Sequence, residues 1–208
     1  MPSGSATRLN KREQLLAEAR AAQRHQERRR TLITRVSWLV GLLIVGTLVM
    51  VGLLSARPET GVVQEIATPF TLPLSEGGEV SLADFAGSPV ILYFNEGAGC
   101  DSCLMQMAEI EKNPGFAEAG IAVLPIVMNS AEHINAERER LHVQAPFALD
   151  DGKVSSAYGT LGNGMHEGLP GHGFVLIDAD GVQRWYGNYP SMWLDPEELL
   201  EIVTAELA

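Results

Sequence analysis

Cysteine is scarce in this chain of 208 residues, which contains two, Cys100 and Cys103. A structural zinc site takes four Cys or His ligands, and no second pair of cysteines is present to complete one. The sequence therefore argues against a zinc site. Three hypotheses remain for two cysteines at this spacing: a redox pair, part of a copper site, or an inert disulfide. We favour the redox pair.

Basic residues are scarce beyond the N-terminal region. Residues 57–208 contain 23 Asp and Glu against six Lys and Arg, which gives this part a net charge of −17. Such a charge repels phosphate backbones and argues against a nucleic-acid partner. Residues 1–31 have the opposite bias, with eight Lys and Arg against three Glu. The sequence thus predicts a basic juxtamembrane segment, residues 1–35, ahead of an acidic remainder.

Charged residues are absent from residues 36–56. A helix of 21 residues is about 31 Å long, which matches the ~30 Å hydrocarbon core of a bilayer. We expect a transmembrane helix and not a cleaved signal peptide, because the basic leader is long, the apolar run exceeds the usual ~7–15 residues, and Leu54 fits badly before a cut after Ala56. The basic flank predicts a cytoplasmic N-terminus, a single pass through the cell membrane, and an extracytoplasmic acidic part, where disulfides can persist.

Residues 57–66 are expected to form a short polar tether, and residues 67–208 one folded domain. Apolar runs bounded by Gly and Pro predict buried strands over 90–94, 121–128, 174–177 and 182–186, and a turn over 76–79 predicts a hairpin. Helical spacing predicts helices over 104–113, 131–143 and 154–158, and a last helix after Asp195. The expected fold class is α/β, a central mixed β-sheet flanked by helices. Four aromatic residues are expected to pack beneath the last helix: Trp185, Tyr186, Tyr189 and Trp193.

The two cysteines lie between the predicted strand 90–94 and the helix after it. A turn into a helix brings the two sulfurs close enough to bond, and the helix N-terminus favours the thiolate that attacks a disulfide. Asp101 and Glu96 should place negative charge close to the Cys100 thiolate and oppose it. We therefore expect the pair to have a reduction potential at the reducing end of the known range, about −270 mV, and to donate electrons.

Several segments together resemble the redoxin branch of the thioredoxin superfamily, namely residues 67–72 and 80–87, the strand ending in Tyr93 and Phe94, the cysteine pair, and residues 174–181. That branch holds the alkyl hydroperoxide reductase/thiol-specific antioxidant proteins and the membrane-tethered envelope thioredoxins. The resemblance covers about residues 65–207 and implies a thioredoxin-like fold. It implies that Cys100 is the attacking thiol and Cys103 the resolving one, with no cofactor.

The chain departs from that family at the expected substrate site. Peroxiredoxins have the motif Pro-x-x-x-Thr-x-x-Cys, which ends in the peroxidatic thiol. If Cys103 takes the place of that thiol, Glu96 replaces the proline and Cys100 replaces the threonine. His172 falls where envelope thioredoxins have a cis-proline and where peroxiredoxins often have an arginine. We expect Pro170 to supply the cis bond instead.

His172 also resembles the metal-binding histidine of Sco-type copper chaperones, where it joins two cysteines. Cys100, Cys103 and His172 would suit Cu(I), because it prefers thiolates with imidazole. Those chaperones separate their cysteines by three residues and not two, which makes this the second hypothesis. Met165 and His166 lie nearby in a Gly-rich loop.

The function predicted from the sequence is that of a membrane-anchored, extracytoplasmic thiol–disulfide oxidoreductase. Its expected substrates are disulfides of envelope proteins, its expected electron donor is a membrane thiol relay, and residues 36–56 are expected to contact the lipid bilayer. Two alternatives stay open: a peroxiredoxin-type peroxidase that uses the same cysteines, and a copper-binding chaperone that uses them with His172.

Overall fold

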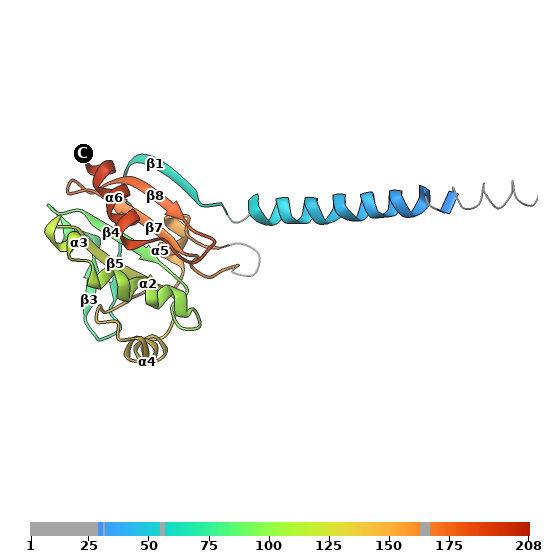
Figure 1. Cartoon of the computed structure of the whole chain (residues 1–208). Coiled ribbons are helices and arrows are strands. Elements are labelled where there is room, and N and C mark those ends of the chain that lie inside the picture. Colours follow the sequence, from blue (N-terminus) through green and yellow to red (C-terminus); the bar gives the residue numbers. More distant parts are fainter. Residues whose placement is uncertain (1–28, 31, 55–56, 163–166) are drawn as a thin grey trace, which may run out of the picture. The chain divides into compact units, whose positions relative to one another are not determined.

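The computed structural model describes residues 29–30, 32–54, 57–162 and 167–208 in two units, Met1–Leu54 and Ser55–Ala208. The first unit contains a helix of 23 residues, Leu32–Leu54, that is long and apolar enough to cross a membrane (Figure 1). A signal sequence near an N-terminus shares these properties, so the membrane span stays a prediction. Apart from residues 29–30 and 32–35, the basic segment lies outside the described residues.

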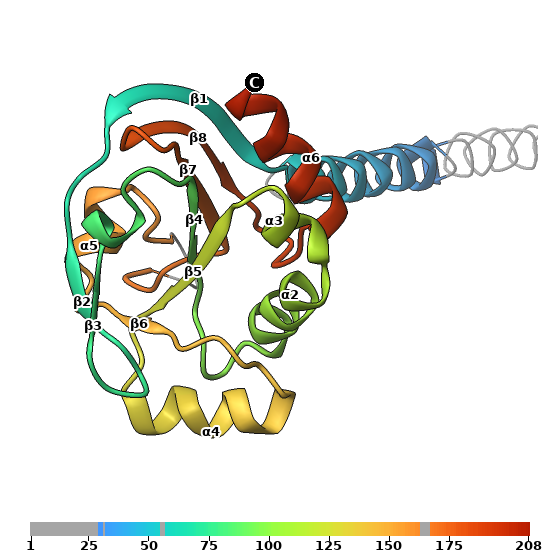
Figure 2. The ribbon, with the colours of Figure 1, turned by 90° about the vertical axis from the view of Figure 1, so that its left-hand side faces the viewer.

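The second unit is built on a six-stranded sheet in the order β1-β8-β7-β4-β5-β6 (Figure 2). Strands β4, β5 and β6 run parallel to one another, and β7, β8 and β1 add to them in antiparallel pairs. Each strand that the apolar runs predicted is present. The bounds are β1 Glu59–Ile66, β4 Val90–Phe94, β5 Ala122–Val127, β6 Ala148–Leu149, β7 Gly173–Ile177 and β8 Val182–Asn188.

The central strand β4 separates two hydrophobic clusters because its side chains alternate between the two faces of the sheet. Ile91 and Tyr93 join the cluster on one face, whereas Val90, Leu92 and Phe94 join the cluster on the other. All five side chains are buried. The uninterrupted apolar run that predicted this strand is thus explained by burial on both sides.

Helices cover one face of the sheet, and a hairpin with short helices covers the other (Figure 2). The first layer holds α2 Asp101–Lys112, α3 Pro114–Glu118, α4 Ala131–Leu141 and α6 Pro196–Leu207. The second holds β2 Thr71–Pro73, β3 Glu79–Ser81, the 3₁₀ helix η1 Leu82–Phe85, and α5 Lys153–Ala157. Helix α6 begins as predicted: Asp195 accepts a hydrogen bond from the Glu197 N–H at 2.9 Å, and Pro196 follows it. The predicted α/β class with flanking helices is confirmed.

The residues expected to form a tether are instead strand β1, which pairs with β8 along one edge of the sheet. Most of its side chains are exposed, including those of Val62 and Ile66. The strand therefore lacks the apolar alternation that marks a half-buried strand. Its place is fixed by backbone pairing, which also covers the edge of β8.

The expectation for the four aromatic residues is half right. Trp185 and Tyr189 are buried in the cluster that contains Leu199 of α6. Tyr186 and Trp193 are 39% and 38% exposed. Tyr186 lies on the opposite face of β8 from Trp185, as neighbouring residues in a strand do, and covers Gly61 of β1.

Candidate functional site

The two cysteines form a disulfide at the start of α2, with their Cα atoms 5.3 Å apart. Cys100 is the N-cap of the helix, and its Sγ atom accepts a hydrogen bond from the Cys103 N–H at 3.3 Å. Cys100 is half-buried, whereas Cys103 has no exposed surface. The first sulfur can therefore be approached from solvent at a helix N-terminus, which stabilises a thiolate, and the second is shielded behind it.

The loop between β4 and α2 is held by two asparagine side chains. Asn95 Oδ1 accepts from the Gly97 N–H at 3.0 Å, and Asn129 Oδ1 accepts from the Ala98 N–H at 2.9 Å. Gly97 has a φ of 67°, and a Cβ atom there would lie 2.0 Å from Asn129 Oδ1. A residue with a side chain does not fit, so the loop that leads to Cys100 requires a glycine at this position. Glu96 is half-buried in the same loop.

Tyr93 lies beneath the second cysteine. Its hydroxyl donates to the Cys103 carbonyl oxygen at 3.0 Å and lies 3.1 Å from Nδ1 of His172. Because the hydroxyl has one proton, which the carbonyl receives, the ring N–H of His172 is the donor in the second contact. Both side chains are almost completely buried against Phe174, whose ring stacks on Tyr93 at 4.6 Å.

Burial sets the charge state of both groups. It raises the pKa of Tyr93 well above its ordinary value and lowers the pKa of His172 to about 4. His172 is therefore a neutral imidazole at physiological pH. It belongs to the support behind Cys103 and is connected to the redox pair through Tyr93.

In this disulfide form the three residues of the copper alternative are not arranged to bind a metal ion, and the alternative stays a prediction. Within the part of the chain that is described, no group of three His, Cys, Asp or Glu side chains is placed to hold a metal ion. The imidazole of His172 contacts the Tyr93 hydroxyl, and the sulfur atoms of Cys100 and Cys103 are bonded to each other. Met165 and His166 lie outside the described residues.

The expected cis-proline is also absent. No cis peptide bond occurs in residues 57–162 or 167–208, so Pro170 follows a trans bond. Pro170 is buried, and the Gly171 N–H after it donates to the carbonyl of Thr160 at 2.9 Å. Backbone pairing with residues 160–161 therefore holds this segment ahead of His172, and no cis bond is needed to shape it.

Asp101 does not act as an uncompensated negative charge beside Cys100. Its carboxylate accepts hydrogen bonds from Arg140 of α4 through both oxygens. Arg140 also donates from Nε to Glu137 at 2.8 Å. The two carboxylates, Asp101 first, raise the pKa of the Arg140 guanidinium above its already high value. This ion pair offsets one of the two carboxylates on which the expectation of a reducing pair depends, and the reduction potential itself stays a prediction.

Comparisons with known proteins agree with this site. The model of the AhpC/TSA family matches residues 63–186. A putative peroxiredoxin from Mycobacterium tuberculosis is 33% identical over 121 residues, which are 55% of this chain and 77% of that protein. Peroxiredoxin Bcp from Escherichia coli is 32% identical over 124 residues, 56% of this chain and 79% of that protein.

Solved structures share the fold. Peroxidoxin BcpB from Mycobacterium tuberculosis superposes with a TM-score of 0.59 at 18% identity, over 69% of this chain and 97% of that chain. A putative protein disulfide isomerase from Bacteroides thetaiotaomicron gives a TM-score of 0.53 at 24% identity, over 70% and 91% of the two chains. The thioredoxin-like fold that the sequence predicted is thus confirmed, and it occurs with more than one thiol chemistry.

Proposed function

Because the chain belongs to the AhpC/TSA family and is a thiol-based oxidoreductase, we propose that it is a peroxidase that reduces hydroperoxides with Cys100 and Cys103. The observation that carries this proposal is the difference between the two sulfurs: Cys100 is half-buried at a helix N-terminus, and Cys103 is fully buried one turn away. The similarity to peroxiredoxins at 32–33% identity favours this activity over the disulfide reduction that the sequence alone suggested.

The proposed reaction has two steps. The Cys100 thiolate attacks one oxygen of the hydroperoxide, the O–O bond breaks, and the other oxygen leaves, after protonation, as alcohol or water. Cys100 is thereby oxidised to a sulfenic acid. The thiol of Cys103 then attacks that sulfur, the disulfide forms, and the sulfenic oxygen leaves as water.

The fold suits the second step. The Cα atoms of Cys100 and Cys103 are 5.3 Å apart in the disulfide, within the ordinary range for such a bond. Cys103 belongs to the first turn of α2 in this disulfide state, so formation of the bond leaves the helix intact. The Cys103 N–H, which points at the Cys100 sulfur, also favours the thiolate needed for the first step.

The cellular setting is part of the proposal. The helix Leu32–Leu54 would anchor the chain in the cell membrane, with the basic segment in the cytoplasm and the acidic domain outside. A membrane thiol relay would reduce the Cys100–Cys103 disulfide after each turnover. The anchor and its orientation rest on the charge distribution and on the apolar helix.

Disulfide exchange with envelope proteins is the second candidate. The observation that favours it is the missing peroxide cradle: Glu96 stands where the motif has proline and Cys100 where it has threonine, if Cys103 is placed at the peroxidatic position. In this candidate Cys100 forms a mixed disulfide with the client protein, and Cys103 resolves it.

Steady-state turnover separates the two candidates. The full-length chain, purified in detergent, is supplied with dithiothreitol and either hydrogen peroxide or a disulfide-bonded protein such as insulin. The peroxidase predicts peroxide consumption above the dithiothreitol background that is lost in Cys100→Ser. Insulin reduction without peroxide consumption would instead select disulfide exchange. Cys103→Ser should slow either turnover, because the resolving thiol is missing.

A further inference from the structure

Arg140 joins the first turn of the redox helix to α4. Its guanidinium contacts both carboxylate oxygens of Asp101, the residue directly after Cys100, and it also contacts Glu137 one turn earlier on α4. Three charged groups from two helices thus form one cluster at the first turn of α2, which begins directly after Cys100. With one cation and two anions, this cluster of Asp101, Glu137 and Arg140 has a net charge of −1.

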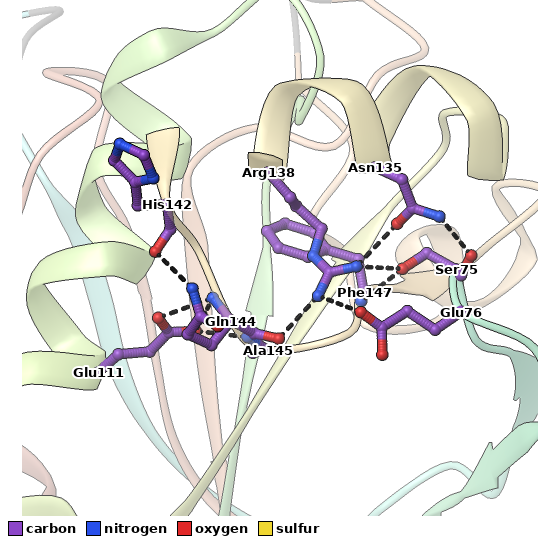
Figure 3. Close-up of polar contacts among 9 residues, drawn as sticks. All are labelled: Ser75, Glu76, Glu111, Asn135, Arg138, His142, Gln144, Ala145 and Phe147. Carbon is purple, nitrogen blue, oxygen red and sulfur yellow. Dashed lines mark hydrogen bonds and ion pairs between the residues drawn. The ribbon is translucent and has the colours of Figure 1, made fainter. Parts of the chain in front are cut away.

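Helix α4 is held in place by a second arginine, Arg138, which is buried under the same helix (Figure 3). Its guanidinium donates to the Ser75 hydroxyl at 3.2 Å, to Asn135 at 2.7 Å and to Glu76 at 2.9 Å. A fourth bond, of 2.7 Å, goes to the carbonyl of Gln144. These contacts fix α4 to the turn between β2 and β3.

Glu111 ties the end of α4 to α2. Its carboxylate accepts the backbone N–H groups of Gln144 and Ala145 at distances of 2.6–3.1 Å, as Figure 3 shows beside the Arg138 contacts. Since Asp101 lies at the start of α2 and Glu111 near its end, both ends of α2 are connected to the C-terminal end of α4 or to the residues that follow it. Arg140 therefore projects from a fixed support.

We propose that Arg140 is a positioning residue of the redox centre, which holds the Asp101 carboxylate toward α4 and offsets part of the negative charge next to Cys100. A thiolate forming on Cys100 is opposed by a nearby carboxylate and favoured by a nearby cation. Arg140 therefore raises the thiolate fraction of Cys100 at a given pH. The remaining carboxylate of the adjoining loop is Glu96, which is unchanged in every variant below. This inference rests on Cys100 being the attacking thiol of the proposed function.

Alkylation of the reduced, full-length chain in detergent tests the proposal without any substrate. The rate of iodoacetamide addition to Cys100, located by mass spectrometry, is measured from pH 6 to 9. Arg140→Gln changes the net charge of the cluster to −2 and Asp101→Asn changes it to zero, whereas the double variant restores −1. We expect Arg140→Gln to react about two- to three-fold more slowly at pH 7, Asp101→Asn to react faster, and the double variant to match the wild type.

Two comparisons identify the cause of any change. Lys112→Gln removes an exposed lysine that pairs with Glu109 at the far end of α2, and it should leave the rate unchanged. The differences among the cluster variants should shrink in 1 M salt, where the Debye length is about 3 Å. Circular dichroism of each variant establishes that α2 and α4 are still folded.

The proposal is overturned if folded Arg140→Gln reacts at the wild-type rate, or if the double variant is as slow as Arg140→Gln. Failure of the proposed function looks different. If the alkylation rates follow the expected order but the chain consumes no peroxide, the role of Arg140 is supported and the peroxidase assignment is wrong.

Discussion

The hydroxyl of Tyr93 donates to the carbonyl oxygen of Cys103 across 3.0 Å, which ties the second cysteine of the redox pair to the central strand of the sheet. The same hydroxyl contacts the buried ring of His172 at 3.1 Å. A single oxygen atom thus connects β4, the start of α2 and the segment before β7. The stability of the site should depend on it.

Removal of that oxygen should destabilise the oxidised chain. In Tyr93→Phe, the Cys103 carbonyl loses its donor and the buried N–H of His172 loses its acceptor, which should lower the free energy of unfolding by about 1–3 kcal/mol. Urea unfolding measures the change. Tyr186→Phe is the control, because Tyr186 is 39% exposed and should shift the free energy by less than about 0.5 kcal/mol. Equal losses in both variants would show that the contact has no special role.

His172 should make the fold sensitive to acid. Its pKa is about 4 in the folded chain and about 6.5 in an unfolded one, so the unfolded state takes up the proton first as the pH falls. Stability is therefore complete above about pH 6.5 and declines between pH 6.5 and 4, by about 3 kcal/mol.

Unfolding measured across that pH range, in the wild type and in His172→Phe, isolates this contribution. The decline should be smaller in His172→Phe, whose buried ring cannot take up a proton. His133→Gln, which changes an exposed histidine on α4, should keep the wild-type dependence. A decline of the same size in His172→Phe would mean that other groups cause it.

The two arginines of α4 should have separable roles. Arg138→Gln removes a buried guanidinium with four hydrogen-bonding partners and should lower the free energy of unfolding by about 2 kcal/mol. Arg140→Gln, two residues away, should leave the unfolding midpoint near that of the wild type, because its ion pairs are exposed. If Arg140→Gln is the more destabilised variant, α4 is held in another way than Figure 3 indicates.

Gly97 should not tolerate a side chain. Gly97→Ala would place a methyl group against Asn129 Oδ1 in a backbone conformation that L-residues rarely adopt, so both the loop and the attack by Cys100 should suffer. We expect a loss of about 2–3 kcal/mol in unfolding free energy. Gly77→Ala also has a positive φ, but its Cβ would meet nothing within 4 Å, so it should lose about 1 kcal/mol. The difference between the two variants measures the close contacts at Gly97, with Asn129, Val127 and Ile134.

The sequence predicts the helices and strands that have local signals, such as an apolar run or a capping residue. Strand β4 and helix α6 are examples, because an apolar run and an N-cap are local signals. Strand β1 has no such signal, since its side chains are mostly exposed and its pairing with β8 is a matter of backbone. The cysteine pair was recognised because the spacing and the helix start are local as well.

The surroundings of the cysteines were harder to predict. Arg140 reaches Asp101 from 39 positions away, and Tyr93 and His172 are 79 positions apart. Contacts of this kind depend on which helices and strands pack together, and residue type alone does not predict that packing. The expectation of a negative charge at Asp101 did not include Arg140 for that reason. The family resemblance singles out His172, but its burial and its contact with Tyr93 depend on the folded structure.

A single-turnover measurement tests the central claim most directly. The fully reduced, full-length chain is mixed with one equivalent of hydrogen peroxide, and the products are followed by mass spectrometry at pH 7. We predict that one disulfide between Cys100 and Cys103 forms per peroxide consumed, much faster than free cysteine reacts, and that Cys103→Ser stops at the sulfenic acid of Cys100. Oxidation no faster than that of free cysteine, or an unchanged rate in Cys100→Ser, would contradict the assignment of this chain as a peroxidase.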